Sequence, residues 1–120
     1  MSERPYQRLV AWKEAYELCL LLYKLTRAFP SDERFALVSQ IRRAASSVPL
    51  NIAEGNAKRS GKEKMHYLLI AMGSLEELHC ACLLSKDLGY LTSVQFAQCD
   101  EHICRVSFLV TKLRSSFISS

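Results

Sequence analysis

The sequence has few of the residues that form tight turns, with only four glycines and three prolines among 120 residues. Sandwiches and barrels of β-strands need frequent turns, so this composition argues against both. The five cysteines are an odd number without the spacing of a disulfide framework, which indicates reduced thiols in a cytoplasmic protein. No uninterrupted apolar run appears long enough to cross a bilayer, and the polar N-terminus lacks a secretory hydrophobic segment, so we expect no membrane partner.

What the chain does have is regular helical spacing. Hydrophobic residues make up 49% of it, enough for one modest core. Apolar residues recur in steps of three and four over residues 8–29, 32–57, 61–88 and 93–116, with short connections between these segments. We therefore predict a single all-α domain over residues 1–120, folded as an antiparallel up-down-up-down four-helix bundle.

The second predicted helix has the most unusual sequence. We expect Ser31 or Asp32 to cap its start after Pro30, and Gly55 to mark its end. Pro49 lies inside it and removes a backbone hydrogen bond, which predicts a kink. The alternative is a helix break that only redirects the chain.

Several apolar residues fall outside the core-facing positions on three of the helices. They are Leu20, Leu21, Ile70, Leu84, Ala97 and Phe108. A helix that is apolar on a second face needs a second partner, which favours a homo-oligomer. The alternative is scattered surface residues, which are common in monomers.

A polar stripe borders the apolar face of the second helix. At 100° per residue, one arc of about 80° holds five polar side chains: Gln40, Arg43, Ser47, Asn51 and Glu54. On the third helix, Glu76 and His79 fall in the apolar arc, and Arg43 is the simplest partner for Glu76. We interpret these residues as a polar network that sets helix register and oligomeric state; a shared functional site is the alternative.

The positive charge is concentrated in one segment. Residues 34–64 hold seven basic and two acidic side chains, so this segment has a net charge of +5. The other residues together have a charge of −1, which gives the chain its net charge of +4. Basic excess is typical of nucleic-acid binding, and the start of the third helix could attract an anion. The candidate contacts are Arg42, which we expect to face outward, and four residues of the following loop: Lys58, Arg59, Lys62 and Lys64. The alternative is a solvated charged loop.

Motifs for catalysis are missing. The sequence contains no nucleophile elbow, no HExxH pair and no series of metal-binding carboxylates, so we expect neither an enzyme nor a cofactor. His79 with Cys82, and Cys99 with His102, could together supply four zinc ligands. Their spacing matches no known finger and cysteine is a common core residue, so we predict no metal site.

A set of short motifs extends through almost the whole chain. It comprises Trp12-x-x-Ala15, Phe29-Pro30-x-x-Glu33, Gln40-Ile-Arg-Arg-Ala44, Ser47-Val-Pro49, Asn51-Ile-Ala-Glu-Gly55, Gly73-Ser74-x-x-Glu77-Leu78 and Leu88-Gly-Tyr-Leu91. Together they resemble the bacterial four-helix-bundle proteins encoded in intervening sequences of 23S ribosomal RNA genes. The matching family residues include Arg42, Arg43, Asn51 and Glu54, whereas His79 stands where many relatives carry an acidic residue.

The resemblance implies a ring-like homopentamer without established enzymatic activity. It also points to a relative, the basic pentameric accessory protein of diversity-generating retroelements, which binds nucleic acid and reverse transcriptase. The sequence thus predicts a non-enzymatic oligomeric bundle that binds RNA or DNA through a basic surface. The alternative is a structural scaffold that binds a protein partner and no nucleic acid.

Overall fold

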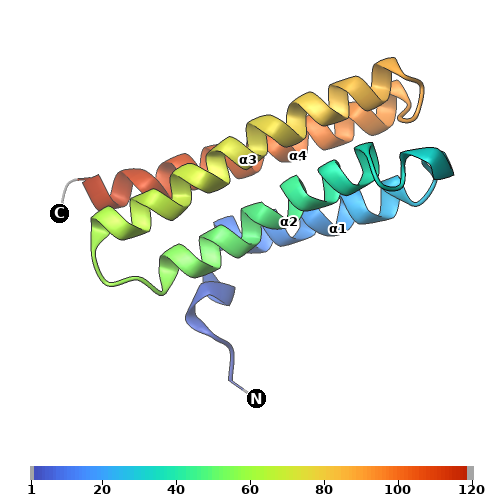
Figure 1. The fold of residues 1–120 in the computed structure, drawn as a ribbon. Coiled ribbons are helices and arrows are strands. Elements are labelled where there is room, and N and C mark those ends of the chain that lie inside the picture. Colours follow the sequence, from blue (N-terminus) through green and yellow to red (C-terminus); the bar gives the residue numbers. More distant parts are fainter. Residues whose placement is uncertain (1, 119–120) are drawn as a thin grey trace.

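The computed structural model describes residues 2–118 and contains no strand within them. Its elements, in order, are η1 (Pro5–Arg8), α1 (Val10–Thr26), η2 (Ser31–Glu33), α2 (Leu37–Asn56), α3 (Gly61–Asp87) and α4 (Ser93–Ile118). Figure 1 shows the four long helices running antiparallel as two hairpins, α1 with α2 and α3 with α4. The prediction of an all-α, up-down-up-down four-helix bundle is confirmed.

The helices α3 and α4 begin at the predicted residues, but α2 does not. Ser31 and Asp32 form the separate 3-10 turn η2 instead of capping α2, so this prediction is wrong. The reason is the backbone of Ala36, whose φ of −118° and ψ of −98° interrupt the helical path. The N-cap of α2 is Ala36, and the Glu33 carboxylate accepts a hydrogen bond from the Leu37 N–H at 3.5 Å. The other carboxylate oxygen accepts a bond from Tyr90, which raises the pKa of that phenol.

The core lies between the two hairpins and follows the predicted steps of three and four. Large side chains that are completely buried come from all four helices: Leu18, Leu22, Ile41, Val48, Ile52, Leu68, Leu75, Leu78, Val106 and Val110. Burying one such side chain stabilises the fold by about 1.5–3 kcal/mol, which makes this core the main source of stability. Just beyond the far end of α3, Gly89 adopts a φ of +83°, the left-handed conformation with which a glycine commonly ends a helix.

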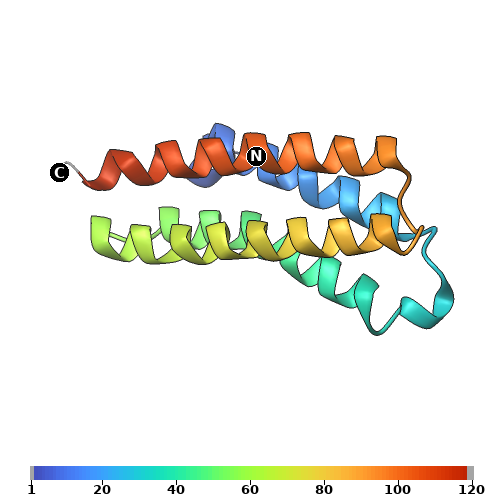
Figure 2. The same cartoon turned by 90° about the horizontal axis from the view of Figure 1, so that it is seen from above.

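The helices α2 and α3 lie close together at one end and separate toward the other (Figure 2). They meet near the α2–α3 connection, where a Cβ placed on Gly55 would lie 3.0 Å from the Cβ of Tyr67 and 3.3 Å from the Lys64 carbonyl oxygen. Glycine at position 55 therefore permits the close approach of the two helices.

The predicted irregularity at Pro49 does not divide α2. Pro49 is buried inside this helix, which continues from Leu37 to Asn56.

The composition of α3 bears on the expectation about membranes. By length and mean hydropathy, α3 is one helix among residues 2–118 that could cross a bilayer, although Glu76 and Glu77 interrupt its apolar residues. In the bundle, 44% of its most apolar window is buried against the other helices. A core helix of a water-soluble bundle has the same composition, so this feature alone does not indicate a membrane protein.

Candidate nucleic-acid interface and the polar seam

The centre of the polar stripe forms a hydrogen-bonded seam between α2 and α3. The Asn51 Nδ2 donates to the Ser47 carbonyl oxygen at 2.8 Å and to the Ser47 Oγ at 3.0 Å. From α3, the buried Ser74 donates its Oγ to the Ser47 Oγ at 2.8 Å. The structure therefore brings Ser47 and Asn51 together. Sequence analysis missed Ser74 as a partner of the polar stripe.

The expected ion pair between Arg43 and Glu76 does not form, so that prediction is wrong. Both side chains are exposed, and neither makes an ion pair within residues 2–118. The buried side of α3 contains Leu75 and Leu78, which turns Glu76 toward water. Across this part of the seam, the Gln40 Nε2 instead donates to the Glu77 Oε2 at 3.0 Å.

The predicted stripe therefore divides into separate parts. Gln40 contacts α3 through Glu77, and Ser47 with Asn51 contacts it through Ser74. Glu54 is exposed near the end of α2 and has no ion-pair partner among the described residues. A single continuous network from Gln40 to Glu54 is absent from the part of the chain that the structure describes.

Arg42 lies against α1, so the prediction that it faces outward is wrong. Its Nε donates to the Thr26 Oγ1 at 3.0 Å, and its Nη2 donates to the Tyr23 carbonyl oxygen at 3.3 Å. The guanidinium also lies 4.8 Å from the centre of the Tyr23 ring. The last carbonyls of a helix lack partners and carry partial negative charge, so a cation is favourable here. Arg42 thus caps the C-terminal end of α1.

Two of the four basic residues near the α2–α3 connection also make intramolecular contacts. The Lys64 Nζ donates to the Asn56 carbonyl oxygen at 3.0 Å, capping the end of α2, and lies 5.7 Å from the centre of the Phe117 ring. The Lys58 Nζ lies 5.3 Å from the centre of the Tyr67 ring. Both ammonium groups keep donors for a further ligand, because an ammonium has three.

The remaining two basic residues, Arg59 and Lys62, are exposed on either side of the N-cap of α3. Neither forms an ion pair with any residue in 2–118. Of the five predicted contacts, these two cations have the fewest intramolecular partners among the described residues, and they lie at one end of the bundle.

The start of α3 is less suited to an anion than its position suggests. The Ser60 Oγ accepts a hydrogen bond from the Glu63 N–H at 3.1 Å and donates to the Glu63 Oε1 at 3.1 Å. This N-cap uses one of the free N–H groups, and Glu63 adds a carboxylate in the first turn. The candidate anion contacts are therefore the basic side chains and not the helix end.

Comparison with known proteins agrees with this architecture. The family model described as 23S rRNA-intervening sequence protein matches residues 7–112. The chain belongs to this family. A crystal structure from Bacteroides thetaiotaomicron, of a protein with unknown function from the S23 ribosomal protein family, is similar with a TM-score of 0.81 and 20% sequence identity. The similarity covers 88% of this chain and 98% of that one, and it shows the shared fold. No curated protein matches the chain.

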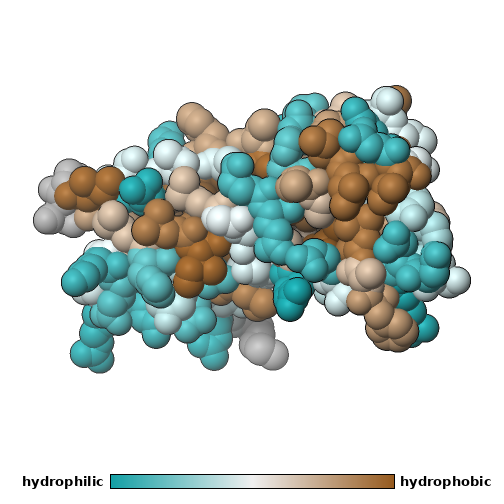
Figure 3. All heavy atoms as spheres, turned by 45° about the horizontal axis from the view of Figure 1, so that its top comes forward, coloured by the Kyte–Doolittle hydropathy of each residue, from teal (hydrophilic) through white to brown (hydrophobic). Residues whose placement is uncertain are grey.

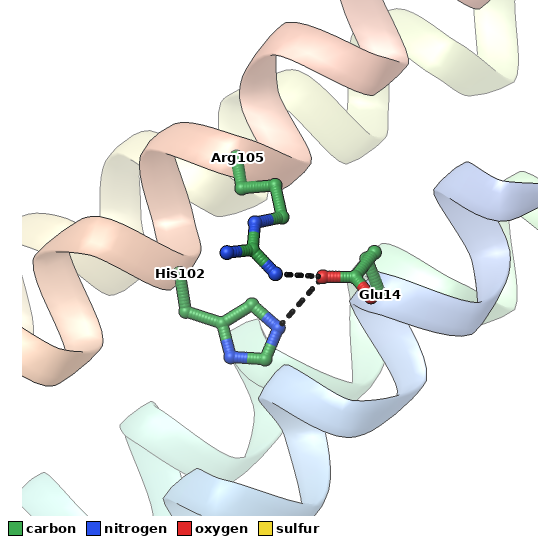
Figure 4. A network of polar contacts seen from close by, with 3 residues as sticks. All are labelled: Glu14, His102 and Arg105. Atoms are coloured by element: carbon green, nitrogen blue, oxygen red, sulfur yellow. Dashed lines mark hydrogen bonds and ion pairs between the residues drawn. The ribbon is translucent and has the colours of Figure 1, made fainter.

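The histidines considered as zinc ligands contact carboxylates. The His79 Nε2 lies 3.1 Å from the Asp100 Oδ1, and the His102 Nε2 lies 3.6 Å from the Glu14 Oε1. Arg105 donates its Nη1 to the same Glu14 oxygen at 3.0 Å, so this cluster joins α1 to α4 (Figure 4). The two histidines thus serve separate contacts between helices.

The cysteines that would complete a zinc site lie in the core. Cys82 and Cys99 are fully buried on α3 and α4. A hydrogen bond with Cys99, together with burial, raises the pKa of Cys82, which opposes formation of the thiolate that zinc requires. Within residues 2–118, no three His, Cys, Asp or Glu side chains cluster as metal ligands.

Where α2 and α3 separate, an apolar groove of about 680 Å³ opens on the surface. Its walls include Phe35, Leu84 and Leu88, and the polar pair Gln40 and Glu77 lies along it. Phe35 is 88% exposed, an unusual state for a large apolar side chain. Figure 3 shows a hydrophobic patch over this end of the molecule.

Other apolar residues predicted to lie off the core behave less uniformly. Leu20, Ile70 and Phe108 are exposed, as is Ala97, whereas Leu21 packs partly against the core. Of the predicted set, Leu84 is the member that lines the groove.

Proposed function

We propose that this protein is a non-enzymatic homo-oligomer that binds RNA or another nucleic acid at the basic end of the bundle. The observation that carries the proposal is the placement of Arg59 and Lys62, which are exposed and unpaired within the described chain. Lys58 and Lys64 add two partly exposed ammonium groups nearby. The family name, which refers to a ribosomal RNA sequence, is consistent with an RNA partner.

The contacts would be made mainly to phosphates. Each lysine or arginine that neutralises a phosphate releases a counterion, so affinity should fall steeply as salt rises. Phosphate contacts carry little sequence information, so sequence preference should be weak. Arg42 is left out of this interface, because its guanidinium is already bonded to the end of α1.

The proposed homo-oligomer, a pentamer by resemblance to the family, would bury the groove between α2 and α3. Phe35, Leu84 and Leu88 give it an apolar wall, and exposed patches of this kind commonly mark protein interfaces. The test is the native mass of Leu84→Glu, for which we expect a smaller assembly. The matched control is Val94→Glu, a change at a residue that is 79% exposed and does not line the groove. Equal masses for wild type and Leu84→Glu would remove the groove from the interface.

Nucleic-acid binding is tested by titrating RNA at two salt concentrations with the double variant Arg59→Gln, Lys62→Gln. We expect weaker RNA binding by this variant. The slope of log affinity against log salt concentration should also become shallower, by an amount equivalent to up to about two released counterions. The charge-matched control is Lys24→Gln, Arg27→Gln, two exposed residues at the other end of the bundle. Equal losses in both double variants would mean that net charge, and not this surface, drives binding.

The second candidate function is a scaffold that binds a protein and no nucleic acid. It is favoured by the same groove, which is large and mostly apolar for a bundle of this size. Absence of RNA and DNA binding at low salt would support the scaffold.

A further inference from the structure

Three aromatic rings near the N-terminus form a ladder made of Tyr6, Trp12 and Tyr16. The rings of Trp12 and Tyr16 are stacked, with centroids 4.8 Å apart and planes inclined by 23°. Tyr6 meets Trp12 edge to face, with centroids 5.0 Å apart. The core accounts for only part of this arrangement, because Tyr16 remains 44% exposed and Tyr6 is half-buried.

The ladder lies beside the basic end of the bundle. Tyr6 lines a surface depression of about 340 Å³ together with Arg4 and, from the end of α2, Glu54 and Ala57. The next residue after Ala57 is Lys58, the first of the basic residues at the connection to α3. In Figure 1 the N-terminal segment lies under α2 on the side of this connection. A chain bound at the basic end could therefore continue onto Tyr6.

Charged residues also flank the ladder itself. Arg4, Arg8 and Lys13 are exposed and form no ion pair with residues in 2–118, and the exposed acids of this segment are Glu3 and Glu17. An exposed aromatic series flanked by free cations complements a ligand that carries both flat apolar groups and regularly spaced negative charges. Glu54 would repel phosphates in the depression, which favours a base edge at that point, where its carboxylate can accept a hydrogen bond.

We propose that the ladder is a stacking surface for the unpaired bases of single-stranded RNA. One base stacks on the exposed ring of Tyr16 and another enters the depression at Tyr6, while Arg4, Arg8 and Lys13 contact the phosphates. This inference rests on the proposed nucleic-acid binding and adds the class of strand that is bound. In a duplex the bases already stack on one another and cannot reach aromatic rings, whereas unpaired bases stack on them readily.

The test measures the affinity of the protein for a short oligoadenylate and for an RNA duplex of the same length. Each affinity is measured at a series of low salt concentrations and extrapolated to molar salt. Electrostatic contacts vanish on that extrapolation, so the remaining affinity reports stacking. We expect preference for the single strand, and about tenfold to hundredfold weaker binding for Tyr16→Leu. Tyr16→Phe keeps the aromatic face and should bind like wild type. Trp12 is the only tryptophan, so its fluorescence should change when the single strand binds.

The outcomes separate this inference from the proposed function. Equal affinity for duplex and single strand, with no effect of Tyr16→Leu, would overturn the ladder while leaving nucleic-acid binding intact. No binding of either RNA would overturn the ladder, and no binding of DNA as well would overturn the proposed function. A change in native mass for Tyr16→Ala, without a change in RNA affinity, would show that this face contacts a second copy of the chain and not RNA. The exposed Leu20→Ala, one turn along α1, is the matched control and should leave RNA binding unchanged.

Discussion

The two ends of the contact between α2 and α3 differ sharply. At the closed end, Gly55 lies against Tyr67 and the Lys64 ammonium binds the last carbonyl of α2. At the open end the same helices separate around a groove, and the exposed side chains of Gln40 and Glu77 bridge them. There α2 is held instead by α1, through Arg42. Along its length, α2 thus lies close to α3 at one end and is hydrogen-bonded to α1 near the other.

The basic residues of α2 and of the α2–α3 connection have different roles at these two ends. Arg42 and Lys64 each bind a carbonyl near the end of a neighbouring helix, so their charge stabilises the fold. Arg59 and Lys62 have no such acceptor within residues 2–118 and remain available to a ligand. Charge alone therefore does not identify an interface; the nearest free helix end must be considered as well.

The closed end should tolerate no added volume. We expect Gly55→Ala to lower the free energy of unfolding by about 1–2 kcal/mol, because the new Cβ meets Tyr67 and a backbone oxygen. Gly73→Ala is the matched control on α3: its Cβ would meet nothing within 4 Å, so it should raise stability by about 0.5–1 kcal/mol. Urea denaturation of both variants measures the difference. Equal effects of the two substitutions would contradict the close approach.

At the open end, the contact of α2 with α1 should depend on Arg42. We expect Arg42→Ala to lower the free energy of unfolding by about 1–2 kcal/mol, since it loses two hydrogen bonds and leaves the Thr26 hydroxyl with fewer partners. Arg43→Ala, at the next residue, removes an exposed side chain and should change stability by less than about 0.5 kcal/mol. If Arg43→Ala were the more damaging of the two, the assignment of Arg42 as the cap would be wrong.

Sequence analysis predicted the four helices because steps of three and four are read directly from the chain, and the buried Leu18, Ile41 and Leu75 follow them. It failed where a residue's role depends on a partner distant in sequence. Helical geometry placed Arg42 and Arg43 on different faces, but it could not show that the end of α1 lies beside the first of them. In the same way, the 100° step could not distinguish Glu76 from Glu77 as the side chain that reaches α2.

Between the two ends, the hydroxyl contact of Ser74 with Ser47 should have an intermediate effect. Ser74→Ala removes a buried donor and leaves the Ser47 Oγ its bond from Asn51, so we expect a loss of about 1 kcal/mol. Ser116→Ala, which removes an exposed hydroxyl near the end of α4, is the control and should be nearly neutral. A neutral Ser74→Ala, measured in the same urea experiment, would show that packing alone joins the helices at this point.

The smallest effect is expected for the exposed bridge across the groove. Gln40→Ala and Glu77→Ala should each change the free energy of unfolding of the monomer by less than about 0.5 kcal/mol, and a double-mutant cycle should give a coupling of similar size. The reason is that water replaces either partner when both are exposed. In an assembly that buries the groove, water is excluded, so the coupling should rise with protein concentration. A coupling that stays constant across concentrations at which the native mass changes would mean that the groove remains open in the assembly.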